Sequence, residues 1–249
     1  MAERLLRGTT ISQGVVMPAQ AAVEALPVRL RIVPRRRCDV RDHPVYLALP
    51  PAAQRSLLQT GAPVDLLAAE QVSLEGDYLW FVLSGVLGLF PQSSTVCVSH
   101  IPSGSVHGWR HALGSSCGDT EARPLVDVRL FRVPAHTVRT ALGHDWLSRF
   151  VAFQTMQRLT QLESEAACNA SHRVNERLAK WLVRLEGGAN GAPLKLTQAR
   201  LGAMLGVQRT SINAAAQELQ EAGLIRFGRG RVEVLDLPGL ATASCGCGA

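Results

Sequence analysis

Cysteines are the residues of this 249-residue sequence with the clearest potential for redox or metal chemistry. There are six, too few and too scattered to cross-link a chain of this length, which favours reduced thiols. The one close pair is Cys245 and Cys247 on a glycine-rich tail, and adjacent thiols can bind a metal ion or oxidise. Because chain ends are commonly disordered, we expect the tail of 241–249 to be flexible and without such a role.

Histidines form a second group of potential metal ligands. His100, His107 and His111 lie in one stretch near Cys117, as they would in a metal-binding β-barrel enzyme. The His-x-His pair with a following Glu that typifies the cupin enzymes is missing, so we predict no metal ligand and no cofactor. A metal-binding or thiol/redox sensor, in which Cys or His residues receive the signal, is the alternative function.

No arrangement of residues indicates catalysis. The sequence contains no nucleophile–base pair, no phosphate-binding P-loop and no Gly-x-Gly-x-x-Gly motif. We therefore expect a protein that is not an enzyme.

Polar residues near the C-terminus suit hydrogen bonding to nucleic acid instead. Arg209 can donate two parallel hydrogen bonds to O6 and N7 of a guanine, and Asn213 can pair with an adenine. The segment 171–249 has ten Lys or Arg against six acids, and a basic module of this kind suggests nucleic acid. The residues that we expect to contact DNA are Thr197, Gln198, Gln208, Arg209, Thr210, Ser211, Asn213, Arg229 and Arg231.

Two short helices must position these side chains. Thr197 is a suitable N-cap for a helix that runs through Leu205, and Gly206 tolerates the positive φ of a tight turn. A second helix from about Gln208 has apolar residues at i, i+4 and i+7 facing inward and polar residues facing outward. Residues 226–235 then alternate as a β-hairpin with an Arg-bearing tip. Together these elements predict a winged helix-turn-helix.

A longer helix is expected before this unit, because residues 144–186 contain neither Gly nor Pro. Its apolar surface is wider than one packing face needs, so we expect the helix of 144–170 to form a homodimer. We expect the run from Gly187 to Gly191 to end the helix that follows it. The residues expected in the dimer interface are Phe150, Phe153, Met156 and Leu159.

Short alternating stretches between 64 and 133 predict an antiparallel sandwich or roll of β-strands. They include 79–90, 95–99 and 126–131, with turn residues between them. We therefore predict an α+β chain. Its expected parts are a partly disordered lead segment (1–42), a β-roll sensor domain (43–143), a dimerisation helix (144–170), a DNA-binding domain (171–240) and a flexible tail (241–249).

Composition agrees with a globular chain, at 47% apolar and 18% charged residues, and excludes wholesale disorder and fibrous proteins. No apolar run approaches the roughly 20 residues that a membrane span needs. The first twenty residues also lack the apolar core of a secretory signal. We expect a cytoplasmic protein that makes no use of a membrane.

Three stretches, Leu201 to Ile212, Leu219 to Ile225 and Gly230 to Asp236, resemble the DNA-binding domain of the Crp/Fnr transcription regulators. Glu165 to Asn169 and His172 to Leu182 resemble the end of that family's dimer helix and the helix beyond it. The terminal Cys-x-Cys resembles a branch common in proteobacteria. The resemblance implies a cyclic-nucleotide-binding-like β-roll of jelly-roll type, a long dimer helix and a winged helix. It also implies double-stranded DNA as partner, with RNA polymerase as a further candidate.

Two departures limit the ligands that the resemblance implies. Members that bind cyclic AMP have a Gly-Glu pair and a later Arg-Ser or Arg-Thr, where this sequence has Gly108-Trp109 and Arg123-Pro124. A tryptophan side chain cannot accept hydrogen bonds from the ribose hydroxyls, and proline has neither a side-chain hydroxyl nor a backbone N–H to donate. Cys38 stands alone in the lead segment, so the iron–sulfur centre of the oxygen-sensing members is not expected either. We expect a regulator without a cyclic AMP response.

Overall fold

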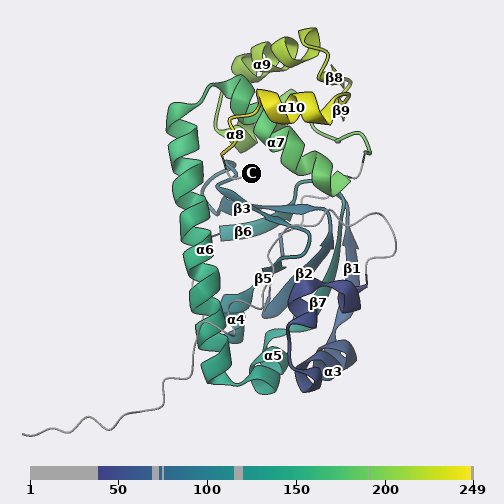
Figure 1. Cartoon of the computed structure of the whole chain (residues 1–249), viewed down its shortest axis with the longest axis vertical. Helices are drawn as coiled ribbons and strands as arrows, with labels where there is room; N and C mark the ends of the chain where they lie inside the picture. Colours follow the sequence, from purple (N-terminus) through teal and green to yellow (C-terminus); the bar gives the residue numbers. More distant parts are fainter. Residues whose placement is uncertain (1–38, 69–72, 75, 115–119, 190, 248–249) are drawn as a thin grey trace, which may run out of the picture.

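A computed structural model describes residues 39–68, 73–74, 76–114, 120–189 and 191–247 of the chain. Figure 1 shows one long helix, α6 (His144–Ser171), along one side of the molecule. At one end of α6 lies α5 (Ala135–Leu142), and at the other end lies a mainly helical C-terminal domain. The β-sheets fill the space between them.

Two antiparallel sheets make up the roll. The first has the strand order β1-β7-β2-β5 and the second has the order β4-β3-β6. Their bounds are β1 (Ala62–Leu66), β2 (Tyr78–Ser84), β3 (Val86–Pro91), β4 (Ser99–Pro102), β5 (Val106–His107), β6 (Thr120–Pro124) and β7 (Val128–Pro134). The interior residues of β2 and β3 are all buried, as expected of strands that lie between two layers.

Short helices close the end of the roll away from the C-terminal domain. Leu57 and Phe81 are fully buried there, together with Leu147 at the start of α6. This shared core fixes the first turns of α6 on the roll. The helices concerned are η1 (Val40–Asp42), α2 (Pro44–Leu47), α3 (Pro51–Thr60), α4 (Trp109–Ala112) and α5.

One expected strand is displaced. The alternation over 95–99 predicted a strand, but β4 begins only at Ser99. The backbone N–H of Cys97 donates instead to the carbonyl of Met204 in the C-terminal domain, at 2.9 Å. This contact across the chain competes with sheet pairing, and a pattern within the segment could not reveal it.

The C-terminal domain contains α7 (Val174–Ala189), α8 (Gln198–Leu205), α9 (Arg209–Glu221), β8 (Ile225–Gly228), β9 (Arg231–Val234) and α10 (Leu237–Ala243). Helix α7 ends at Ala189, within the run from Gly187 to Gly191 that was expected to end it. A Cβ on Gly188 would lie 2.6 Å from Cγ2 of Val86, so glycine here permits close packing of α7 on the roll. The predicted α+β architecture of antiparallel roll, long helix and winged helix-turn-helix is confirmed.

Candidate nucleic-acid interface

Helices α8 and α9 form the helix-turn-helix that the sequence predicts. The Thr197 side chain accepts a hydrogen bond from the N–H of Arg200 at 3.1 Å and so caps α8. Gly206 ends α8 with φ of 67°, a conformation that costs other residues free energy. Ile212, the first inward residue of α9, is fully buried. The turn is therefore rigid at both ends, and it fixes the direction of α9.

The opposite face of α9 is polar and exposed over its first turns. Arg209 is the first residue of the helix, and its side chain lies in solvent, as do those of Thr210 and Asn213. Gln198 donates from Nε2 to Oδ1 of Asn213 at 2.9 Å, which joins the start of α8 to this face. Ser211 is half-buried at the edge of the face. The predicted polar residues of both helices thus lie on one continuous surface.

The hairpin β8–β9 carries the two arginines that were expected at its tip. Arg229 has φ of 47° and Gly230 has φ of 75°, so both turn residues adopt positive φ, as hairpins of this tightness require. Arg229 and Arg231 are exposed. Arg226, by contrast, pairs with Glu233 on the neighbouring strand, with N–O separation of 2.8 Å. The tip therefore presents two cations to a ligand.

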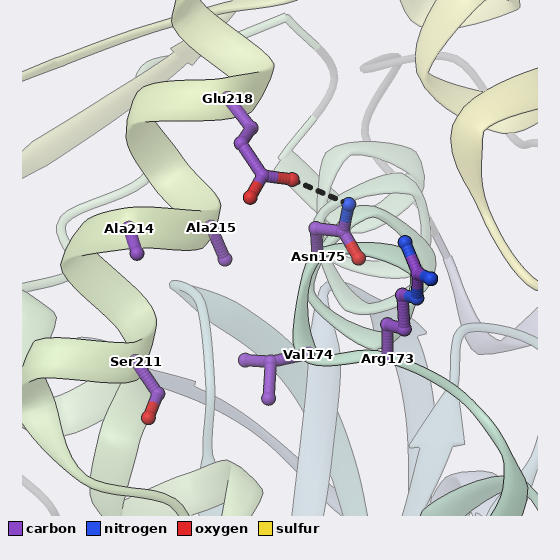
Figure 2. A pocket seen from close by; sticks show the side chains of 7 residues that line it. All are labelled: Arg173, Val174, Asn175, Ser211, Ala214, Ala215 and Glu218. Carbon is purple, nitrogen blue, oxygen red and sulfur yellow. Dashed lines mark hydrogen bonds between the residues drawn. The ribbon is translucent and has the colours of Figure 1, made fainter.

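A shallow depression of about 250 Å³ lies between the start of α7 and α9. Figure 2 shows Asn175 facing Glu218 across it, with Arg173 next to Asn175. Asn175 donates to the carboxylate of Glu218 at 2.6 Å, which ties the two helices together. Arg173 is an exposed cation that sequence reasoning did not single out, because it stands outside the helix-turn-helix pattern.

Two other cations of the C-terminal domain make contacts with the β-roll. Arg200 donates to the carbonyls of Ala68 and Pro124 at 3.1 and 3.0 Å. Lys195 lies 3.2 Å from the carboxylate of Asp127. These contacts hold the C-terminal domain on the roll in the conformation described here.

Helix α6 divides into an inner and an outer face. Phe150 is only 8% exposed and packs on Trp109, with ring centroids 4.4 Å apart. The ring is therefore packed within the chain, which leaves it little surface for the predicted dimer interface. Met156 and Leu159 are 61% and 47% exposed, and Phe153 is half-buried. The outer face thus keeps three of the four expected apolar residues.

The stretch compared with the cyclic AMP cassette is occupied by contacts within the chain. Trp109 is buried against Phe150. Arg123 donates from Nε to the carboxylate of Glu121 at 3.0 Å, and its guanidinium lies 5.3 Å from the centre of the Phe90 ring. No free phosphate clamp is found among these described residues.

Two of the three histidines considered as possible metal ligands have separate side-chain partners. His100 contacts the side-chain amide of Gln161, with its Nδ1 3.1 Å from Nε2, and His111 lies 3.2 Å from the carboxylate of Asp77. Burial lowers the pKa of His100 to about 3, and burial with the nearby charge of Arg158 lowers that of His107 to about 4. Cys117 lies outside the described residues.

Within the described part of the chain, one set of side chains brings four potential metal ligands together. The set is Cys168, His172, Cys245 and Cys247. Sequence reasoning noted the last two and assigned them to a flexible tail without a role. The other two lie more than 70 positions earlier, so sequence spacing gave no indication of the set.

Comparisons with known proteins agree with this geometry. Residues 176–243 match the family model of the Crp-like helix-turn-helix domain. Comparison with curated protein sequences found no significant match. Among the described residues, every helix is too short or too polar to span a lipid bilayer.

Several solved structures share the fold over most of the chain. One is assigned to the crp/fnr family of transcriptional regulators from Eubacterium rectale, with 16% identity, 80% of this chain and 97% of that chain covered, and a TM-score of 0.59. FixK2 from Bradyrhizobium japonicum has 16% identity, coverage of 75% and 98%, and a TM-score of 0.55. A CRP/FNR-family regulator from Thermus thermophilus has 23% identity, coverage of 75% and 100%, and a TM-score of 0.51. These likenesses show a common fold.

Proposed function

We propose that this chain, whose residues 176–243 form a Crp-like helix-turn-helix domain, is a sequence-specific DNA-binding transcription regulator. It binds a two-fold symmetric operator as a homodimer. The observation that carries the proposal is the exposed polar surface of α9, with Arg209 in its first turn. Next to it, Arg229 and Arg231 at the β8–β9 tip are exposed, and among the described residues neither forms a salt bridge with an acidic side chain.

Base reading is assigned to the first turns of α9. The N-terminal residues of a recognition helix meet base edges in the major groove. Arg209 there donates two hydrogen bonds to a guanine, a pattern that no other base accepts in that groove. Asn213 lies one turn further along, with its carbonyl already bonded to Gln198, so its amide group donates to an adjacent base. The operator therefore has one guanine in each half-site that depends on Arg209.

Relatives with this fold commonly have Ser-Arg-Glu-Thr-Val-(Ser/Gly)-Arg at the start of the recognition helix. Here Thr210 stands in place of the glutamate that accepts from cytosine, and Ala214 stands in place of the second arginine. The remaining operator positions therefore differ from those of cyclic-AMP-responsive relatives.

Phosphate contacts are assigned to the cations and hydroxyls around this surface. Arg229 and Arg231 on the hairpin, Thr197 and Gln198 at the start of α8, and Arg173 before α7 all lie near α9. Such contacts position the protein and add affinity without reading sequence. Their loss weakens binding to every duplex alike.

The outer face of α6 is the proposed dimer interface. Its exposed positions 152, 156, 159, 163, 166 and 170 are separated alternately by four and three residues, which is the repeat of a coiled-coil seam. Met156 and Leu159 provide the apolar centre of this seam, and the alanines at 166 and 170 allow close approach. A dimer through this face has two-fold symmetry, which its operator must share.

We also propose that cyclic AMP does not regulate the protein. Trp109 is part of the core under α6, and Arg123 is engaged by Glu121 and the Phe90 ring. Calorimetric titration with cyclic AMP should show no binding at micromolar concentrations. Specific binding in that range would overturn this part of the proposal.

The experiment that tests DNA reading is selection from a randomised duplex library with the wild type and Arg209→Ala. The wild type should select a palindrome with a guanine in each half-site. Arg209→Ala should lose preference at that guanine alone, at a cost of ~1–3 kcal/mol. Arg226→Ala is the matched control, since Arg226 is paired with Glu233. Equal loss for all sequences in Arg209→Ala would show that Arg209 contacts phosphate and reads no base.

A further inference from the structure

Four side chains from two distant segments meet where α6 ends. Cys168 lies in the last turn of α6, and His172 follows that helix directly as its C-cap. Cys245 and Cys247 come from the segment after α10. Their ligand atoms, three Sγ and one ring nitrogen, all lie within 4.8 Å of one another.

We propose that these four residues bind a zinc ion. Zinc bound by sulfur at about 2.3 Å in a tetrahedron requires ligand atoms about 3.8 Å apart, and a nitrogen ligand shortens that distance slightly. Cys168 Sγ and Cys245 Sγ are 3.5 Å apart, and Cys247 Sγ and His172 Nδ1 are also 3.5 Å apart. The set therefore needs only small side-chain adjustments to receive the ion. Three cysteines and one histidine are a common ligand set of structural zinc.

The charges around the four residues match the charge of such a site. Three thiolates, a neutral imidazole and Zn²⁺ carry a net charge of −1, and each cysteine proton leaves to solvent when the metal binds. Lys180 Nζ lies 2.9 Å from Cys168 Sγ, and Arg184 donates to the carbonyl of Cys247 at 3.1 Å. Glu165 pairs with both cations and neutralises one of them. One positive charge thus remains next to the site.

A disulfide accounts for these contacts less completely. A bond between Cys168 and Cys245 would use two of the four residues and leave Cys247 and His172 without a role. All four converge on one point, and one of them, Cys168, is fully buried. A tetrahedral metal ion uses all four.

The proposed zinc ion would join three parts of the molecule. Cys168 belongs to the proposed dimer helix, and His172 belongs to the two-residue junction before α7. Cys245 and Cys247 follow α10, which packs on α7. The ion would therefore hold the DNA-binding domain at a fixed angle to α6. This consequence rests on the function proposed above, whereas the metal site itself does not.

Metal analysis of the full-length protein, purified without a metal-affinity step, tests the site. One zinc per chain is expected, and X-ray absorption should show three sulfurs at about 2.3 Å and one nitrogen at about 2.0–2.1 Å. Cobalt added to the metal-free protein should give the thiolate charge-transfer and d–d bands of tetrahedral coordination. Protein without stoichiometric zinc after equilibration with micromolar Zn²⁺, or zinc in an all-oxygen and nitrogen shell, would overturn the proposal.

Variants assign the ligands. The double substitution Cys245→Ser and Cys247→Ser should abolish stoichiometric zinc, and His172→Ala should weaken its binding. Cys97→Ala is the matched control, since Cys97 is buried elsewhere in the core and its Sγ bonds to the Ser99 carbonyl. Zinc content in the double variant equal to that of the wild type would contradict the assignment. If the double variant does not fold, the absorption spectrum of the wild type decides alone.

DNA affinity provides a separate readout. Removing zinc with a chelator should weaken binding to the selected operator about tenfold, within the 5–150-fold range usual for coupled sites. If the protein binds stoichiometric zinc but its operator affinity does not change when the zinc is removed, the metal site would stand. The proposal that zinc fixes the angle between α6 and the DNA-binding domain would then be refuted. A zinc protein that binds no DNA at all would refute the proposed function and leave the site intact.

Discussion

Replacing Glu165 by Gln should destabilise the protein strongly, because this carboxylate is the shared partner of a buried lysine and a partly buried arginine. Glu165 is 5% exposed and Lys180 is 4% exposed. Lys180 Nζ lies 2.7 Å from one carboxylate oxygen and Arg184 lies 2.6 Å from the other. Burial alone would raise the pKa of the Glu165 carboxyl, but its hydrogen bonds and charge interactions with the two cations lower it below its ordinary value. The group is therefore ionised at neutral pH.

The expected loss follows from the charge left behind. Removing one partner of a buried ion pair costs about 3–5 kcal/mol, because the remaining charge is desolvated and uncompensated. The glutamine oxygen can still accept one hydrogen bond, so we expect about 3 kcal/mol. For a chain of this size that corresponds to a decrease of roughly 6–12 °C in Tm.

Thermal unfolding followed by circular dichroism measures this decrease. Asp65→Asn is the matched control, since Asp65 also holds an arginine by two hydrogen bonds, to Arg129 at 2.8 and 3.0 Å, but it is exposed. An exposed pair contributes about 0–1 kcal/mol, so the control should change Tm by only a few degrees. Equal Tm changes in the two variants would refute the view that the Glu165 cluster is a desolvated ion network.

Three further predictions test other parts of the molecule. Replacing Phe153 and Leu159 by Glu should give monomers with weak operator binding, and a wild type that sediments as a monomer at micromolar concentration would contradict the proposed interface. Arg229→Ala or Arg231→Ala should weaken all duplexes alike and reduce the salt slope of log K by about 0.9 for each lost phosphate contact. Burial lowers the pKa of His43 to about 4, and its neutral ring accepts from the N–H of Val45 and contacts the carbonyl of Ser105. At this residue the unfolded chain therefore binds a proton that the folded chain excludes. As pH falls from about 6.5 to 4, His43 should lower the free energy of unfolding by up to ~1.4 kcal/mol per pH unit, in addition to the shares of His100 and His107. Urea titrations at several pH values check this, and an unchanged slope in His43→Gln would contradict the assignment to His43.

The helix-turn-helix could be predicted from sequence because its determinants are local. Thr197 caps its helix, Gly206 adopts positive φ at the turn, and Ile212 faces the core at a spacing that one helix defines. Each of these features depends on residues within a few positions. The exposed position of Arg209 follows from the same helical period.

Features that depend on contacts between distant segments could not be predicted in this way. Phe150 has the composition and spacing of an interface residue, but Trp109 from the roll covers it. The stretch 95–99 has the alternation of a strand, but Cys97 bonds to the C-terminal domain instead. Cys245 meets Cys168 only because α10 packs on α7. In each case the partner lies far away in the sequence.

Titration of the selected operator, followed by fluorescence anisotropy, tests the central proposal most directly. Three duplexes are compared: the operator, a shuffled sequence of the same composition, and the operator with five base pairs inserted between its half-sites. The insertion turns one half-site by about half a helical turn, since B-DNA has about 10–10.5 base pairs per turn. The account predicts affinity for the operator at least ~10³-fold above the shuffled duplex, and a large part of that preference lost on insertion. Equal affinity for all three duplexes would contradict a dimeric, sequence-specific regulator.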